Sequence, residues 1–233
     1  MDRATASAGM TVAHPPQPQR ATLLAGLQAA PADPLLLQAL TQRCEAEEAW
    51  LDLHTALSSS LPHLPAGSEL EAMCLYYCGK AAVELGKYHE ARPHLERSIQ
   101  LQPGFGYTHQ LLGRCCREMG DANAALIAFR SVTEVLPDFP WGWLDFGELL
   151  LQQGQATEAV DALRQAHRAA RQAGDSHTAP VDAALQRALE AKLEQRRAQL
   201  TNERFPGVAT LSPAQQLQLS LALLQDLRVA PQP

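Results

Sequence analysis

The histidines and cysteines of this chain are the side chains whose types and spacing could carry chemistry. His89, Glu90 and His94 stand close together, as the residues of a zinc-protease helix do. In such a helix the two histidines are four residues apart, so that both face the metal from one side. Here they are five apart, and Pro93 lies between them. The spacing predicts solvent-facing histidines early in a helix, and no metal site.

Four of the five cysteines form two close pairs in the sequence. Cys74 and Cys78 are four residues apart, and Cys115 and Cys116 are adjacent. Four thiols could gather around a metal ion, but no pair has the two-residue spacing of a typical zinc site. A free cysteine otherwise behaves as a small hydrophobic residue. We predict that these cysteines pack in the core, with Cys44 as a further core residue.

Other patterns typical of enzyme sites do not stand out. Gly104-Phe105-Gly106 lacks the third glycine and the preceding strand of a nucleotide-binding loop. We find no nucleophile elbow, no Walker motif and no paired-carboxylate site. We therefore predict that the chain is not an enzyme, with no catalytic residue and no cofactor.

Composition excludes further classes of function. The 233 residues carry a net charge of −6, which does not favour a nucleic-acid partner. No apolar run is long enough to span a membrane. The first residues lack the apolar segment of a secretory signal, and five cysteines give no disulfide framework. These features predict a cytoplasmic protein.

The elements that must position these side chains follow an interval of 34 residues, which is typical of a solenoid of paired helices. Pro103 and Pro137 are separated by this interval. Glycine in the turn between two helices can adopt a positive φ, and glycine within a helix indicates close approach of a neighbour. Small residues form three such columns: Gly79, Gly113 and Gly147; Gly86, Gly120 and Gly154; and Ala91, Ala125 and Ala159.

This pattern resembles the tetratricopeptide repeat family. The resemblance covers residues 72–173, as three repeats at 72–105, 106–139 and 140–173. It implies an all-α fold, a right-handed α-solenoid of tandem helix–turn–helix repeats with flanking helices. The family's columns are clearest in the third repeat, at Trp143, Phe146, Gly147, Leu150, Ala159, Leu163 and Ala166.

The flanking segments differ from the repeats. Residues 30–63 have small and apolar residues in the second-helix columns but lack both glycines, so a degenerate repeat and unrelated helices both remain open. Ser68 and Glu71 have the spacing of a capping box at the start of the first clear repeat. We expect a disordered tail at 1–20, N-terminal helices at 21–63, a capping helix at 180–200, a loop at 201–211 and a terminal helix at 212–229.

The resemblance also indicates where a partner would bind. In this family the first helix of each repeat lines a concave groove. The corresponding positions include aromatic and basic residues, which are frequent at binding hot spots and favour an acidic partner segment. The predicted partner-binding residues are Tyr76, Lys80, Tyr107, Gln110, Arg114, Arg117, Trp141, Leu144 and Glu148.

Three functions are compatible with these residues. The first is an interaction module or adaptor that binds a peptide or helical segment of another protein in the groove. The second is a client-specific chaperone that shields an apolar segment, suggested by Met73, Val83, Leu144 and Leu151 at groove positions. The third is a non-catalytic regulatory or targeting subunit of a transferase-type enzyme. The residues of the family's chaperone-tail clamp are not present.

Overall fold

The computed structural model describes residues 19–174, 178–204, 212–215 and 217–218. Within these ranges the regular elements are helical and none is a strand. The predicted tail at 1–20 lies almost wholly outside the described residues, as does most of the predicted loop and terminal helix. The chain divides into two compact units, Met1–Gly120 and Asp121–Pro233.

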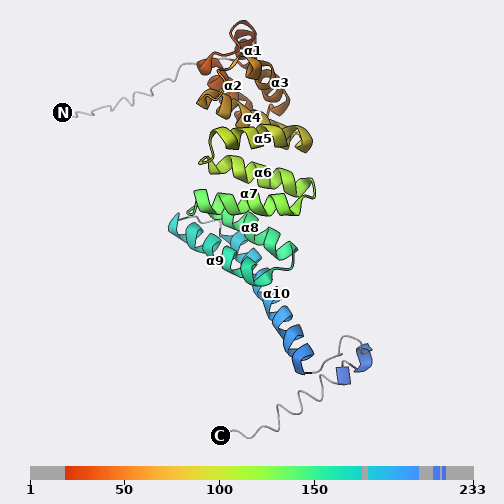
Figure 1. Cartoon of the computed structure of the whole chain (residues 1–233). Coiled ribbons are helices and arrows are strands. Elements are labelled where there is room, and N and C mark those ends of the chain that lie inside the picture. The colour runs from red at the N-terminus through yellow and green to blue at the C-terminus, as the bar shows by residue number, and fades with distance from the viewer. Residues whose placement is uncertain (1–18, 175–177, 205–211, 216, 219–233) are drawn as a thin grey trace, which may run out of the picture. The chain divides into compact units, whose positions relative to one another are not determined.

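In the first unit the helices follow one another in chain order, and each contacts the next (Figure 1). The first helices of successive pairs also touch, since α4 contacts both α2 and α6. One face of this unit is therefore formed by α2, α4 and α6. Its helices are α1 (Arg20–Ala29), α2 (Pro34–Ala46), α3 (Trp50–Ser60), α4 (Glu69–Glu84), α5 (Tyr88–Leu101) and α6 (Gly106–Glu118), with a 3-10 turn at Leu61–His63.

In the second unit α8 packs against both α7 and α9, and α10 packs against α8 and α9. Val181, Ala184 and Ala188 of α10 are buried there, whereas Leu193 is 69% exposed. The first half of α10 thus covers the preceding helix pair with small residues, and α10 continues beyond residue 200. The helices are α7 (Ala122–Val135), α8 (Pro140–Gln152), α9 (Ala156–Gln172) and α10 (Ala179–Arg204).

Local sequence explains where the helices begin. Asp33 accepts hydrogen bonds from the backbone N–H groups of Leu35 and Leu36, which would otherwise lack partners at the start of α2. Ser68 accepts the N–H of Glu71 at 3.1 Å, and the Glu71 carboxylate accepts the N–H of Gly67. The Ser68 half of the expected capping box is therefore formed and sets the start of α4, whereas the Glu71 side chain bonds the residue before the N-cap and not the N-cap itself.

The glycine columns have the two physical roles expected of them. The turn glycines Gly86, Gly120 and Gly154 have φ values of 71°, 78° and 75°, which other residues adopt only with strain. Gly79 lies within α4, where a Cβ atom would come 2.6 Å from Leu95 Cδ2 of α5. The absence of a side chain at Gly79 lets α4 and α5 pack at close range.

The core of the first unit joins the N-terminal helices to the first clear repeat. Leu40 of α2 and Leu53 and Leu57 of α3 are fully buried in one cluster with Cys74 and Cys78 of α4. A neighbouring cluster contains Ala91 and Leu95 of α5 with Leu111 and Cys115 of α6. The segment that precedes the repeats is therefore part of the same hydrophobic core as α4.

Candidate partner-binding surface

Four aromatic rings pack edge to face on the first unit, where α4 meets the start of α6. The Tyr76 ring lies 4.8 Å from Tyr77 and 5.0 Å from Phe105, and Phe105 lies 5.6 Å from Tyr107. We refer to these residues as the aromatic cluster. Phe105 and Tyr107 are 37% and 44% exposed, whereas Tyr76 and Tyr77 are half-buried, so the cluster has a half-buried base and an open surface.

Burial sets the protonation state of Tyr76, which lies at the base of the aromatic cluster. Desolvation is the main cause that raises the pKa of Tyr76 well above its ordinary value, with smaller contributions from Tyr77 and Glu45. The hydroxyl group is therefore neutral at physiological pH and can donate a hydrogen bond. A rigid, partly exposed aromatic surface with a polar group is suited to contact with an apolar or aromatic side chain.

Lys80 lies next to this cluster but its charge is matched. Its ammonium group pairs with the carboxylate of Glu45 on α2 and lies 5.6 Å from the centre of the Trp50 ring. Attraction to a ring face adds to the ion pair and holds the lysine side chain in place. Lys80 therefore fixes α2 and α4 together as well as contributing to the surface.

The two predicted arginines of α6 also have acidic neighbours. Arg114 is 3.5 Å from Glu84, and Arg117 is 3.7 Å from Glu118. Exposed pairs of this kind contribute only about 0–1 kcal/mol, so either arginine can exchange its partner for another carboxylate at small cost. Gln110 is half-buried on the same helix.

The three predicted binding residues of the second unit differ in exposure and in contacts. Trp141 is 36% exposed at the start of α8. Leu144 is 9% exposed and belongs to the core cluster of this unit, so it offers little surface to a partner. Glu148 pairs with Arg187 of α10 at 2.8 Å. Of the three, only Trp141 presents an aromatic surface that a partner could contact.

Phe105 and Tyr77 are not among the residues that the sequence predicts for the site. Phe105 is the last residue of the first predicted repeat, and in the structure it directly precedes α6 as its N-cap residue. A signal is present, because Phe105 and Phe139 are themselves 34 residues apart. Tyr77 is adjacent to a groove position and gives no comparable signal.

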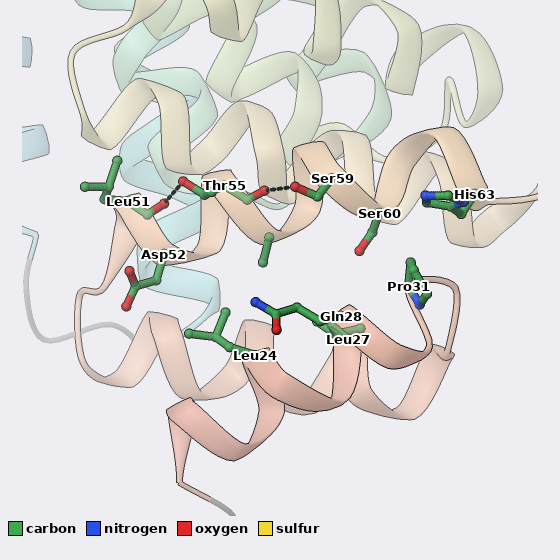
Figure 2. Close-up of a pocket in the computed structure, with 11 residues that line it drawn as sticks. Leu24, Leu27, Gln28, Pro31, Leu51, Asp52, Thr55, Ser59, Ser60 and His63 are labelled. Atoms are coloured by element: carbon green, nitrogen blue, oxygen red, sulfur yellow. Dashed lines mark hydrogen bonds between the residues drawn. The ribbon is translucent and has the colours of Figure 1, made fainter.

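A cleft in the first unit is also absent from the sequence-based expectations. It encloses about 600 Å³ between α1 and α3, a volume within the range of small-molecule pockets (Figure 2). Thr55 and Ser59 donate hydrogen bonds to the carbonyl groups of Leu51 and Thr55 in their own helix. Gln28, Asp52, Ser60 and His63 are further polar side chains of the lining. The apolar part of its lining comes mainly from Leu24, Leu27, Leu51 and Ala56.

The five cysteines are free and buried. Desolvation by burial raises the pKa of the thiol to about 11 for Cys44, about 12 for Cys74 and about 11 for Cys115. A protonated, buried thiol is a poor nucleophile. The cysteines thus pack in the core, as expected.

The two histidines of α5 differ from each other. His89 is exposed, as expected, whereas His94 is half-buried. Burial lowers the pKa of His94 from its ordinary value, and the neighbouring His54 lowers it further. The His94 ring lies 6.5 Å from the His54 ring of α3.

No helix in the described part of the chain is both long and apolar enough to cross a bilayer.

Helices packed in consecutive pairs, with glycine turns at a fixed interval, define a helical-repeat protein. Residues 82–140 match the family model described as tetratricopeptide repeat. The predicted resemblance to this family and the predicted all-α solenoid fold class are therefore confirmed.

Solved structures share this fold. One is the crystal structure of MamA, with 21% identity and a TM-score of 0.60 over 66% of this chain and 88% of that one. Another is YrrB, described as a TPR protein with an unusual peptide-binding site, with 20% identity and a TM-score of 0.56 over 74% and 81%. A third is MamA 41-end from Desulfovibrio magneticus RS-1, with 16% identity and a TM-score of 0.51 over 70% and 96%. The comparison with curated proteins found no match.

Proposed function

We propose that this chain is a protein-interaction module that binds a peptide segment of a partner on the first-helix face of its first unit. The observation that carries the proposal is the aromatic cluster, whose rings pack edge to face and remain partly exposed at Phe105 and Tyr107. Aromatic side chains lose little conformational entropy on binding and supply a large contact area. One of the structural relatives, YrrB, is described as having a peptide-binding site.

The chemistry of the surface suggests what the segment contains. An apolar or aromatic side chain would pack on Phe105 and Tyr107, and a nearby carboxylate would exchange with Glu84 for Arg114, which is 3.5 Å from Glu84. Arg117 would supply a second positive charge on the same helix. We therefore propose a segment that carries both an apolar anchor and acidic residues.

The chaperone hypothesis has less support from the same residues. It rests on apolar groove positions, but Val83 and Leu144 are 4% and 9% exposed. Buried side chains of this kind stabilise the helix pairs and present little apolar surface to a client. The peptide-binding proposal uses side chains that are exposed.

The test is selection of peptides from a random display library on the purified chain, followed by affinity measurement for the selected peptide. We expect Phe105→Ala with Tyr107→Ala to weaken binding by about tenfold or more, because truncation of a hot-spot aromatic costs about 2 kcal/mol. We expect Arg114→Glu with Arg117→Glu to weaken it as well, most strongly at low salt.

The matched control is Ile127→Ala, which removes an apolar side chain that is 69% exposed on α7. It should leave both affinity and helical content unchanged. Selected peptides that bind all these variants equally well would contradict the placement of the site. A library that yields no binding peptide would contradict the function itself.

A further inference from the structure

Two histidines and a cysteine from three consecutive helices converge inside the first unit. His54 comes from α3, Cys78 from α4 and His94 from α5, and one potential ligand atom of each lies within 4.8 Å of the other two. Ligand atoms that share one tetrahedral zinc ion are roughly 3.5 Å apart, given bonds of about 2.0–2.3 Å. Side-chain rotations that move each atom by about 1 Å would therefore close the set around one ion.

The bonding of these side chains is incomplete without a further partner. His54 Nε2 is buried, and no described residue forms a hydrogen bond with it. The Cys78 sulfur shares a hydrogen bond with the Ser58 hydroxyl at 3.4 Å. Buried polar atoms nearly always have partners, and a nitrogen without one requires an explanation.

The side chains around the cluster carry charges of both signs. Burial and the positive charge of Lys87 lower the pKa of His54, and burial and His54 lower the pKa of His94, so the neutral rings have a lone pair available for a metal. Glu90 Oε2 lies 3.7 Å from His54 Nε2 and also pairs with Lys87 at 3.1 Å. A divalent ion would be balanced by the Glu90 carboxylate and by the thiolate that forms when Cys78 loses its proton to solvent.

We propose that His54, Cys78 and His94 form a site for a zinc-type divalent transition-metal ion. Two imidazole nitrogens and one thiolate sulfur are the ligand types that such an ion prefers, and magnesium or calcium would require oxygen ligands. A water molecule or the Glu90 carboxylate, which lies 3.7 Å from His54 Nε2, would complete the coordination. The ion would join α3, which precedes the clear repeats, to both helices of the first repeat.

Sequence inspection misses this combination for a simple reason. The ligands are 24 and 16 residues apart, so they form no short motif. In the sequence the nearest histidine to His94 is His89, and the nearest cysteine to Cys78 is Cys74. The fold instead brings His94 and Cys78 close to each other and to His54, on three different helices. His54 lies on α3, in the segment without a regular repeat pattern.

Cobalt(II) is the probe for this site, because a bound thiolate gives cobalt a charge-transfer absorption band and a tetrahedral site gives it intense visible bands. The full-length chain is freed of metal with a chelator, kept reduced with a phosphine and titrated with cobalt. We expect one equivalent to bind per chain with both sets of bands, and zinc to displace it. Zinc should also raise the Tm of the chain.

Three variants assign the ligands. Cys78→Ser should abolish the charge-transfer band, and His54→Asn and His94→Gln should each weaken cobalt binding by about tenfold or more. The control is Cys74→Ser, on the same helix and equally buried, which should keep the bands. Circular dichroism of each variant without metal shows whether it is folded. If Cys78→Ser does not fold, the two histidine variants test the site in its place.

Two results would overturn the proposal. One is a wild-type chain that shows no charge-transfer band with cobalt in several-fold excess. The other is a band that survives Cys78→Ser or the combined histidine substitutions, since the metal would then bind elsewhere.

Discussion

Replacing Gly79 with alanine would place a methyl group where α4 and α5 are in closest contact. The new Cβ would lie 2.6 Å from Leu95 Cδ2 and 2.7 Å from Leu95 Cγ, well inside van der Waals contact. Leu95 is fully buried, so it cannot move into solvent to make room. The next atom, the carbonyl oxygen of Ala91, is at an ordinary distance of 3.5 Å.

The expected free-energy change combines two opposing effects. Forcing an extra methyl group into a packed core costs about 1–3 kcal/mol, whereas alanine is favoured over glycine within a helix by about 1 kcal/mol. The net loss of stability for Gly79→Ala is therefore about 0–2 kcal/mol. Leu95→Ala removes both clashing atoms and itself costs about 2–5 kcal/mol.

A double-mutant cycle separates these effects. In the Leu95→Ala background Gly79→Ala should stabilise the chain by about 1 kcal/mol, because only the helix preference remains. The coupling between the two sites should therefore be about 1–3 kcal/mol. Urea unfolding followed by helical circular dichroism would measure all four chains.

Gly104→Ala is the control, since a Cβ at this position would meet no atom within 4 Å beyond its chain neighbours and the φ of Gly104 is not positive. It should show no coupling to Leu95→Ala. If Gly79→Ala changes stability by the same amount in both backgrounds, within about 0.5 kcal/mol, steric contact with Leu95 is not the reason for this glycine.

Three smaller predictions follow from local contacts. Ser68→Ala should cost about 1 kcal/mol by removing the cap of α4. Thr55→Ala should change urea stability by less than half of that, because the exposed Thr55 hydroxyl bonds only within its own helix. Ser98→Ala should cost about 1–2 kcal/mol, because the buried Ser98 hydroxyl donates to the Ala72 carbonyl at 2.9 Å. The thiol pKa of Cys74 is about 12 when folded. At pH 9 only about one folded Cys74 thiol in a thousand is ionised against about half in the unfolded chain, so folded Cys74 should resist thiol reagents. By the same linkage, its contribution to stability is complete below about pH 9 and falls as the pH rises towards 12.

The repeat architecture could be predicted from the sequence because its demands fall on the same few positions in every copy. A turn that needs a positive φ selects glycine at Gly86 and again at Gly154, and both have this φ. A close helix contact selects glycine at Gly79. Constraints of this kind appear as columns in the sequence, whatever the surrounding residues are.

The candidate binding surface was only partly predictable, since it depends on contacts between repeats. The family pattern predicted Tyr76 and Tyr107 as groove residues, but not that Phe105 would lie between them and connect their rings. It also gave no sign that Lys80 would pair with Glu45 from a segment without clear repeats. Pairings between helices depend on the packed structure, and a single repeat pattern does not contain them.

The contact between Gly79 and Leu95 has a counterpart in the second unit, where a Cβ on Gly147 would lie 2.6 Å from Leu163 Cγ. In both cases the glycine and the leucine belong to the same 34-residue copy, 16 residues apart. Genetic recombination that inserts or deletes a whole copy keeps each glycine with its leucine. The gene can therefore change the number of copies without disturbing this contact. A crossover that falls between the two positions instead combines the glycine of one parent with the leucine of the other.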